Sequence, residues 1–244
     1  MNVALRQLSK RFGSTPALEN LSLGINPGQT VAVIGLNGAG KTTLLRCLAG
    51  IVAPSRGEVL YDGTKFHRDR LDLRRRFMFL PDFPALYADM NALQHASLML
   101  RVYGRDSGPA EEAVMRALSE LDMLPLAEVP LGQLSRGQIY KAALTGLFAV
   151  APELWLLDEP FASGLDPQGL AVLKQEARFL ATRGGTVIYS TQILEVAEKF
   201  SDQLIVIDHG RLVAVYTRAQ LAALPPDGPD SLEARLRQFR EVPV

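Results

Sequence analysis

The sequence contains few of the residues that build disulfides and metal centres. Of its 244 residues one is a cysteine, Cys47, and three are histidines, His67, His95 and His209. A single cysteine excludes an internal disulfide, and its place in an apolar run predicts a small buried side chain in a reducing compartment. The histidines lie too far apart to show ligand spacing, which argues against a zinc-type site.

An excess of one charge and long apolar runs are also absent. Lys and Arg together number 26, as do Asp and Glu, so the formal net charge is zero. A neutral chain has no overall field that attracts nucleic acid, and we expect no such partner; the basic run 74–76 is expected to be a solvated face or a partner contact. No stretch reaches the roughly 18 apolar residues of a membrane helix, and residues 1–10 lack a signal-peptide core. Any role at a membrane is therefore expected to be exercised from outside the bilayer.

What the sequence does contain is the material of a packed α/β fold. Its apolar share of 48% suffices for one large domain or two small ones. Leu21, Leu23 and Ile25 alternate with polar residues, which predicts a half-buried strand of an antiparallel sheet. The continuous apolar run 30–34 instead predicts a strand buried on both faces, and a helix is predicted to begin at Lys41.

The second half of the chain is predicted to contain a helical insertion followed by a parallel sheet. Residues 91–150 show helical periodicity and weak strand signals. Beyond them, predicted strands alternate with predicted helices, which is the βαβ order of a parallel sheet, and His209-Gly210 predicts a terminal hairpin. We predict one domain over residues 1–220, with its helical part at about 90–150, and a proline-rich linker with a short helix over 221–244.

Residues 35–42 match the phosphate-loop pattern G-x-x-x-x-G-K-[ST] and lie between a predicted buried strand and a predicted helix. Glycines let the backbone N–H groups wrap around phosphate oxygens, and the helix start adds partial positive charge. Lys41 would neutralise the β- and γ-phosphates, and Thr42 would offer its hydroxyl to Mg²⁺. The residues predicted to bind nucleotide in this segment are Gly35, Leu36, Asn37, Gly38, Ala39, Gly40, Lys41, Thr42 and Thr43.

Two adjacent acids, Asp158 and Glu159, follow the predicted buried strand 154–157. Parallel sheets bind their ligands at the carboxyl ends of strands. Asp158 is predicted to hold the Mg²⁺ shell, and Glu159 to act as general base on the attacking water. Taken alone such a pair is usually solvated, but the phosphate loop favours the catalytic interpretation.

Leu134-Ser135-Arg136-Gly137-Gln138 resembles the L-S-G-G-Q signature of the ATP-binding cassette family, and the resemblance extends over nearly the whole chain. It matches Phe12 to the aromatic that stacks on adenine, residues 163–166 to the loop after the catalytic acid, and residues 190–192 to a switch segment. The resemblance implies a phosphate-loop NTPase of α/β class, with a mixed central sheet, an antiparallel β subdomain and a helical signature subdomain. It also implies an ATPase that uses ATP and Mg²⁺.

In this family two cassettes pair head to tail, so Ser135 and Gly137 would complete the ATP site of the other subunit, and Ser163 and Asp166 would lie in the dimer loop. The resemblance further implies a separate membrane permease as partner, with the chain peripheral on the inner face of the cell membrane. Residues 230–234 look like the tail of cassettes that serve bacterial type-two exporters.

Three residues depart from the family pattern. Asp82 stands in place of a glutamine and adds negative charge beside a triphosphate, although it offers oxygen to Mg²⁺. Gln192 replaces a histidine that touches the γ-phosphate, and its amide cannot become cationic. Arg136 replaces a signature glycine, and its guanidinium is suited to a phosphate. Glu159, Gln192 and Asp82 are the predicted catalytic residues.

Three functions therefore stay open. The first is a transport ATPase that drives a separate permease, for which we predict modest turnover that Glu159→Gln abolishes. The second is a soluble, non-transport cassette ATPase. The third, which the three departures suggest, is a hydrolysis-impaired nucleotide-sensing cassette that pairs with a different, active cassette.

Overall fold

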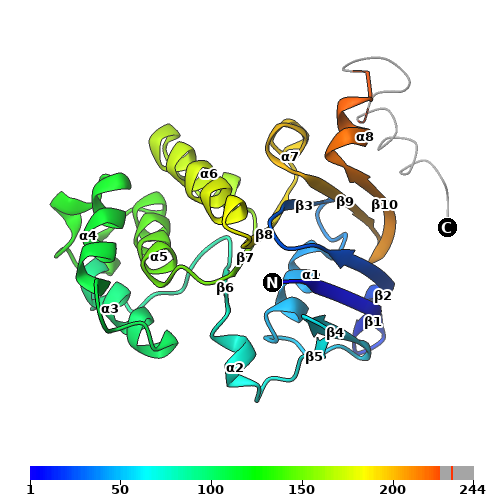
Figure 1. Ribbon diagram of the computed structural model, residues 1–244, viewed down its shortest axis with the longest axis horizontal. Helices are drawn as coiled ribbons and strands as arrows, with labels where there is room; N and C mark the ends of the chain where they lie inside the picture. Colours follow the sequence, from blue (N-terminus) through cyan, green and yellow to red (C-terminus); the bar gives the residue numbers. More distant parts are fainter. Residues whose placement is uncertain (226–231, 233–244) are drawn as a thin grey trace.

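The computed structural model describes residues 1–225 and Leu232, which form two sheets and a helical insertion (Figure 1). The smaller sheet is antiparallel and has the order β2-β1-β4-β5. Its strands are β1 (Val3–Phe12), β2 (Thr15–Ile25), β4 (Arg56–Tyr61) and β5 (Thr64–Lys65). The strand predicted from the alternation at 21–25 is present, and it starts six residues before Leu21.

The larger sheet has the order β10-β9-β3-β8-β7-β6 and is parallel except for β10, which pairs antiparallel with β9. Its strands are β3 (Thr30–Ile34), β6 (Phe77–Leu80), β7 (Leu154–Leu157), β8 (Thr186–Thr191), β9 (Gln203–Asp208) and β10 (Arg211–Thr217). The predicted parallel sheet, the terminal hairpin and the mixed sheet type are confirmed. In register, Ile34 pairs with Thr191 and Leu157 pairs with Leu80, so the residues after these strands meet at one edge of the sheet.

Helices connect the parallel strands, as the βαβ order predicts. Helix α1 (Lys41–Leu48) follows β3, α6 (Pro167–Thr182) follows β7 after the 3₁₀ turn Pro160–Ala162, and α7 (Leu194–Phe200) follows β8. Helix α1 lies between the two sheets and contains Cys47. Burial raises the pKa of this thiol to about 11, which agrees with the predicted unreactive side chain.

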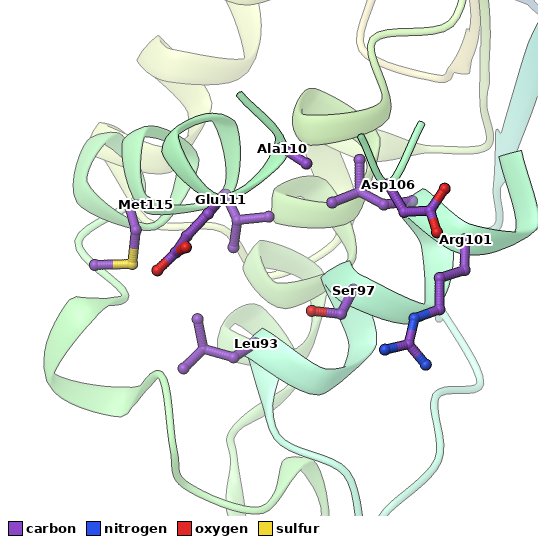
Figure 2. Close-up of a pocket in the computed structure, with 9 residues that line it drawn as sticks. Leu93, Ser97, Arg101, Asp106, Ala110, Glu111 and Met115 are labelled. Atoms are coloured by element: carbon purple, nitrogen blue, oxygen red, sulfur yellow. The ribbon is translucent and has the colours of Figure 1, made fainter. Parts of the chain in front are cut away.

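The helical insertion consists of α3 (Ala92–Tyr103), α4 (Ala110–Glu120) and α5 (Arg136–Val150). Two 3₁₀ turns, Leu124–Leu126 and Leu131–Gln133, join α4 to α5. Both α3 and α5 begin with a capping box. In each, the side chain of the N-cap residue accepts the backbone N–H of the third helical residue, and the side chain of that residue accepts the backbone N–H of the N-cap residue. A pocket of about 460 Å³ opens between α3 and α4, with Arg101 and Met115 at its rim (Figure 2).

The larger sheet has a hydrophobic core on each face, and β3 contributes to both. Ala32 and Ile34 belong to the core that includes the helical insertion, while Val31 and Val33 belong to the core around α1 and the antiparallel sheet. This arrangement explains why every residue of β3 is buried, as the continuous apolar run predicts.

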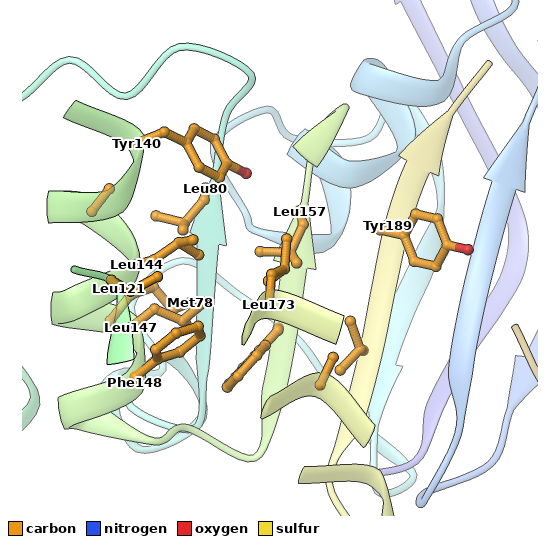
Figure 3. Close-up of a cluster of buried hydrophobic side chains, with 14 of the residues drawn as sticks. Met78, Leu80, Leu121, Tyr140, Leu144, Leu147, Phe148, Leu157, Leu173 and Tyr189 are labelled. Carbon is orange, nitrogen blue, oxygen red and sulfur yellow. The ribbon is translucent and has the colours of Figure 1, made fainter. Parts of the chain in front are cut away.

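The helical insertion is joined to the larger sheet through α5. Figure 3 shows Leu144 and Phe148 of α5 facing Met78 and Leu80 of β6. Each fully buried side chain of this size contributes about 1.5–3 kcal/mol of transfer free energy, so the contact is a strong one.

The core on the side of the helical insertion also includes residues from the C-terminal part of the chain, among them Leu204, Val206 and Leu232. The predicted division at residue 220 falls inside α8 (Arg218–Ala222) and stays a prediction. Leu232 is buried, but the rest of residues 226–244, including most of the tail that resembles type-two exporter cassettes and the helix predicted there, lies outside the described residues. Within the described part of the chain, no helix has the length and apolar character needed to span a membrane.

Candidate functional site

The phosphate loop, residues 35–40, runs from β3 to α1, and its glycines are required by close backbone contacts. A Cβ atom on Gly35 would lie 2.3 Å from the carbonyl oxygen of Ile207, and one on Gly40 would lie 2.7 Å from that of Ala17. Gly38 and Gly40 also have positive φ angles of 82° and 108°. The loop is therefore held between β9 and β2 in a shape that side chains would not permit.

Lys41 is the first residue of α1, and its buried side chain reaches back to this loop. Its Nζ atom donates to the carbonyl oxygens of Gly35 at 2.9 Å and Leu36 at 3.2 Å. The same ammonium group is 3.3 Å from Oε1 of Glu159. The structure thus brings the predicted phosphate-binding cation and the predicted general base into direct contact.

Asp158 accepts hydrogen bonds from two hydroxyl groups at the carboxyl-terminal edge of the parallel strands. Thr42 Oγ1 donates to Asp158 Oδ1 at 3.1 Å, and Ser190 Oγ donates to the same oxygen at 2.6 Å. Ser190 Oγ in turn accepts the backbone N–H of Glu159 at 2.8 Å. Ser190, which the sequence placed only within the switch segment, therefore joins the ends of β7 and β8.

Glu159 has a φ angle of 47°, a left-handed conformation that is uncommon for a residue with a side chain. Its backbone is held by Ser190, and its Oε1 accepts a hydrogen bond of 3.4 Å from Gln192 Nε2. Glu159 and Gln192, two of the three predicted catalytic residues, are therefore in contact. Backbone strain such as the positive φ angle of Glu159 is concentrated at functional sites.

A cavity of about 500 Å³ contains these groups. It is lined by Ala17, Leu36, Asn37, Gly38, Gly40, Lys41, Thr42, Thr43, Arg46, Asp82, Arg136, Asp158, Glu159, Ala162 and Gln192. Asp82 is thus brought to the site, as predicted. The cations Lys41, Arg46 and Arg136 face three carboxylates, so the charge is balanced before any ligand enters.

The signature segment lies at the start of α5, and its predicted role at the partner's nucleotide stays a prediction. Arg136 lines the cavity of its own chain, and its guanidinium carbon lies 6.0 Å from the centre of the Phe83 ring. The rest of the segment lies at or just before the start of α5. Ser135 and Gln138 form the capping box, and Leu134 packs against the core beside the insertion.

The loop that includes Ser163 and Asp166 packs against the signature segment. A Cβ atom on Gly137 would lie 2.2 Å from the carbonyl oxygen of Gly164, so the two backbones touch. Asp166 Oδ2 accepts a hydrogen bond of 2.7 Å from Lys141 on α5, and Ser163 Oγ donates to the carbonyl oxygen of Pro160 at 2.7 Å. Lys141 was not predicted, although a lysine inside the apolar stretch 139–144 is itself a signal that a partner is needed.

Phe12, the predicted adenine-stacking residue, does not line the cavity. It ends β1 with 51% of its surface exposed, and Lys10 Nζ lies 4.9 Å from its ring centre. The exposed ring is available for stacking, but the structure does not bring it together with the phosphate loop residues.

Tyr140 is a further residue near the site that the sequence did not indicate. It is fully buried, and its hydroxyl has no hydrogen-bond partner within the described residues. Burial raises the pKa of Tyr140, and the charges of Asp158 and Asp82 raise it further. Figure 3 shows the ring next to Leu80, with its hydroxyl pointing away from α5.

Comparisons with known proteins agree on one family. The ABC transporter family model matches residues 18–162. The ABC-type transporter ATP-binding protein EcsA of Bacillus subtilis is 31% identical over 90% of this chain and 88% of its own. A solved ATP-binding subunit of an ABC transporter superposes with a TM-score of 0.85 at 28% identity, covering 98% of this chain and 94% of the other. The dimeric structure of MJ0796, a bacterial ABC transporter cassette, superposes with a TM-score of 0.78 at 26% identity, covering 88% and 98%.

Proposed function

The chain belongs to the ABC transporter family, as an ATP-binding and ATP-hydrolysing subunit, and we propose that it works as half of a cassette dimer on the inner face of a membrane, below a separate permease. The observation that carries the proposal is the meeting of Lys41, Asp158 and Glu159 in one cavity. Because its relatives are transporter subunits, the soluble, non-transport alternative is set aside.

In this proposal the triphosphate lies along the phosphate loop, with residues 35–43 around its β- and γ-phosphates and the exposed Phe12 ring against the base. Lys41 now contacts Glu159 and two carbonyl oxygens. Phosphate oxygens compete for the same ammonium group, and charge-assisted bonds to phosphate are strong. Nucleotide binding therefore draws Lys41 away from Glu159 and leaves that carboxylate free to act.

Glu159 is the proposed general base. A water oxygen forms the new bond to the γ-phosphorus, the bond from that phosphorus to the bridging oxygen breaks, and Glu159 accepts the proton, which yields ADP and phosphate. Gln192 donates to the same carboxylate and so orients it. Asp82 lines the same cavity, where its negative charge would oppose the triphosphate and slow turnover.

The residues present fit a bound Mg²⁺. Thr42 Oγ1 and Asp158 Oδ1 are 3.1 Å apart at the mouth of the phosphate loop, and both are the hard oxygen donors that Mg²⁺ prefers. A Mg²⁺ ion keeps several waters and takes its remaining ligands from one or two carboxylates and the substrate phosphates, so two protein ligands suffice. When bound, the ion neutralises charge that develops on the phosphate oxygens.

The signature segment is proposed to face the nucleotide of the second cassette, identical or different, when the dimer closes. Ser135 and Gly137 lie at the N-terminal end of α5, where the helix dipole favours an anion. The contact between Gly137 and Gly164 joins this segment to the proposed dimer loop, which includes Ser163 and Asp166. Closure at one nucleotide would therefore move the loops of both sites together.

The permease is proposed to dock in a groove of about 470 Å³ between α2 (Leu71–Arg74) and α3. Leu71 and Val102 line it with 60% and 58% of their surfaces exposed, which is unusual for apolar side chains of this size. Arg74 and Arg75 provide a basic rim, so a partner segment with apolar anchors and acidic ends fits best.

The test is phosphate release by the purified chain with and without Mg²⁺, compared with Lys41→Ala and Glu159→Gln. Lys41→Ala is expected to lose nucleotide binding. Glu159→Gln is expected to bind ATP as well as the unmodified chain does while turnover falls by about two orders of magnitude or more. Unchanged turnover in Glu159→Gln would remove the proposed role of that residue, and ATP binding without turnover in the unmodified chain would favour the hydrolysis-impaired alternative.

A further inference from the structure

One buried hydroxyl beside the nucleotide cavity has no partner to offset its burial. Tyr140 is fully buried, and its hydroxyl makes no hydrogen bond with any described residue. Leaving a buried hydroxyl unpaired destabilises the folded chain, and a phenylalanine at this position would avoid that cost. The cost is accounted for by a state of the protein in which the hydroxyl has a partner.

The Tyr140 hydroxyl is directed toward the place where two acids enter the nucleotide cavity. Figure 3 shows the ring beside Leu80, with its hydroxyl pointing away from α5 in the direction of β7. Leu80 ends β6 and pairs with Leu157 at the end of β7, and its carbonyl oxygen accepts the backbone N–H of Asp158 at 2.8 Å. Asp82 follows two residues after Leu80, and both acids line the cavity.

Of these two acids, Asp82 is the one without a hydrogen-bond partner. Asp158 is buried and already accepts hydrogen bonds from Thr42 and Ser190. Asp82 is exposed and makes no hydrogen bond or ion pair with any described residue. Burial, together with the charges of Asp158 and Asp82, raises the pKa of Tyr140, so its hydroxyl keeps its proton and acts as a donor. An unpaired donor and an unpaired acceptor therefore lie at the same edge of the cavity.

We propose that, when nucleotide binds, the Tyr140 hydroxyl donates to the carboxylate of Asp82 and holds it away from the triphosphate. This inference rests on the proposed function of the cavity. In the free chain water solvates the exposed carboxylate. The entering triphosphate displaces that water and repels the carboxylate, so a hydrogen bond on the side away from the ligand becomes favourable. Tyr140 does not line the cavity and acts through Asp82, so it is a positioning residue that limits the charge repulsion.

The experiment measures the affinity of the whole chain for Mg-ATP by calorimetry in the Glu159→Gln background, in which turnover does not consume the ligand. Tyr140→Phe is expected to weaken binding about tenfold when Asp82 is present, because a hydrogen bond to a charged group is lost. When Asp82→Ala is also present, the same substitution should change the affinity less than about twofold, since no carboxylate remains to be held. The matched control is Tyr61→Phe, which deletes a buried hydroxyl that donates to Leu48 and should leave the affinity unchanged.

Three results would overturn the inference. An equal loss of affinity with and without Asp82 would show that the Tyr140 hydroxyl does not act through that residue. No loss in either background would show that nucleotide binding does not use the hydroxyl, and an equal loss in Tyr61→Phe would show that the effect comes from reduced stability. A Glu159→Gln chain that binds no Mg-ATP would instead contradict the proposed function itself, and the inference would fall with it.

Discussion

Two tyrosines that are equally buried have opposite hydrogen-bonding surroundings. The Tyr61 hydroxyl donates to the carbonyl oxygen of Leu48 at 2.5 Å, whereas the Tyr140 hydroxyl has no partner among the described residues. On folding, an unpaired buried hydroxyl loses its hydrogen bonds to water and gains none in exchange. Deleting such a hydroxyl therefore removes a desolvation penalty from the folded state. The same deletion should therefore have different effects at the two positions.

We predict that Tyr61→Phe lowers the free energy of unfolding by about 1 kcal/mol, while Tyr140→Phe leaves it unchanged or raises it. Urea unfolding of both variants checks this, with the m-value showing whether the denatured state has changed. Each variant is the control for the other, because both retain a buried phenyl ring. A loss for Tyr140→Phe as large as that for Tyr61→Phe would mean that the Tyr140 hydroxyl has a partner, such as a trapped water.

The residues of the site differ in how far the sequence could predict them. The phosphate loop and the Asp158-Glu159 pair are continuous in sequence, and each requires particular residue types at fixed spacing, so pattern alone located them. Ser190 and Tyr140 contribute through contacts between segments far apart in the chain. The place of Arg136 depends on how α5 packs against β6, and no local pattern records that packing.

At the scale of elements, one ion pair joins α5 to α6. Asp166 caps α6 by accepting the N–H of Gly169 at 2.7 Å, and its second oxygen accepts from Lys141. The hydrogen bond from Lys141 is the main cause that lowers the pKa of Asp166 below its ordinary value of 3.8. Because the pKa of Asp166 is lower in the folded chain than in the unfolded chain, the ionised carboxylate stabilises the fold. This stabilisation is complete at a pH above the unfolded pKa, and it is lost as the pH falls through the folded pKa.

We predict that, when the pH is lowered from about 5 to about 3, the free energy of unfolding falls further for the unmodified chain than for the Asp166→Asn variant. Asparagine retains an oxygen for the N–H of Gly169 but cannot pair with Lys141 as an anion. The carboxylate is largely exposed, so the difference should stay below about 1 kcal/mol. Thermal unfolding of both proteins across this range measures it, and parallel curves would show that the pair does not contribute.

The sequence predicted some strands well and missed others for a physical reason. The run 30–34 is continuous and β-branched because both of its faces are buried, and this signal is unambiguous. Strand β6 was not predicted, although β7, which also has four residues, was. A run of four apolar residues does not identify a strand by periodicity alone, and only β7 is followed directly by the acid pair that drew attention to it. In β1 charged residues interrupt the alternation, because the pairing with β2 and β4 contains register shifts.

At the scale of the whole molecule, the helical insertion is connected to the catalytic sheet by one continuous core. Leu144 and Leu147 of α5 belong to the same buried cluster as Leu157, which directly precedes Asp158. The segment from Leu80 to Phe83 links β6 to the cavity through Asp82. A change of ligand at the cavity therefore has a packed route to α3 and to the groove beside it.

The groove between α2 and α3 makes the coupling to a membrane partner testable. We predict that the double variant Leu71→Ser, Val102→Ser keeps the phosphate release of the isolated chain, because neither side chain lines the nucleotide cavity. It should lose co-purification with the co-expressed permease, because exposed apolar anchors near the centre of an interface contribute most of its affinity. The matched control is Met115→Ser, which alters an exposed apolar side chain on α4 outside the groove. If the double variant still co-purified with the permease, or if the control lost co-purification equally, the groove between α2 and α3 would not be the docking surface.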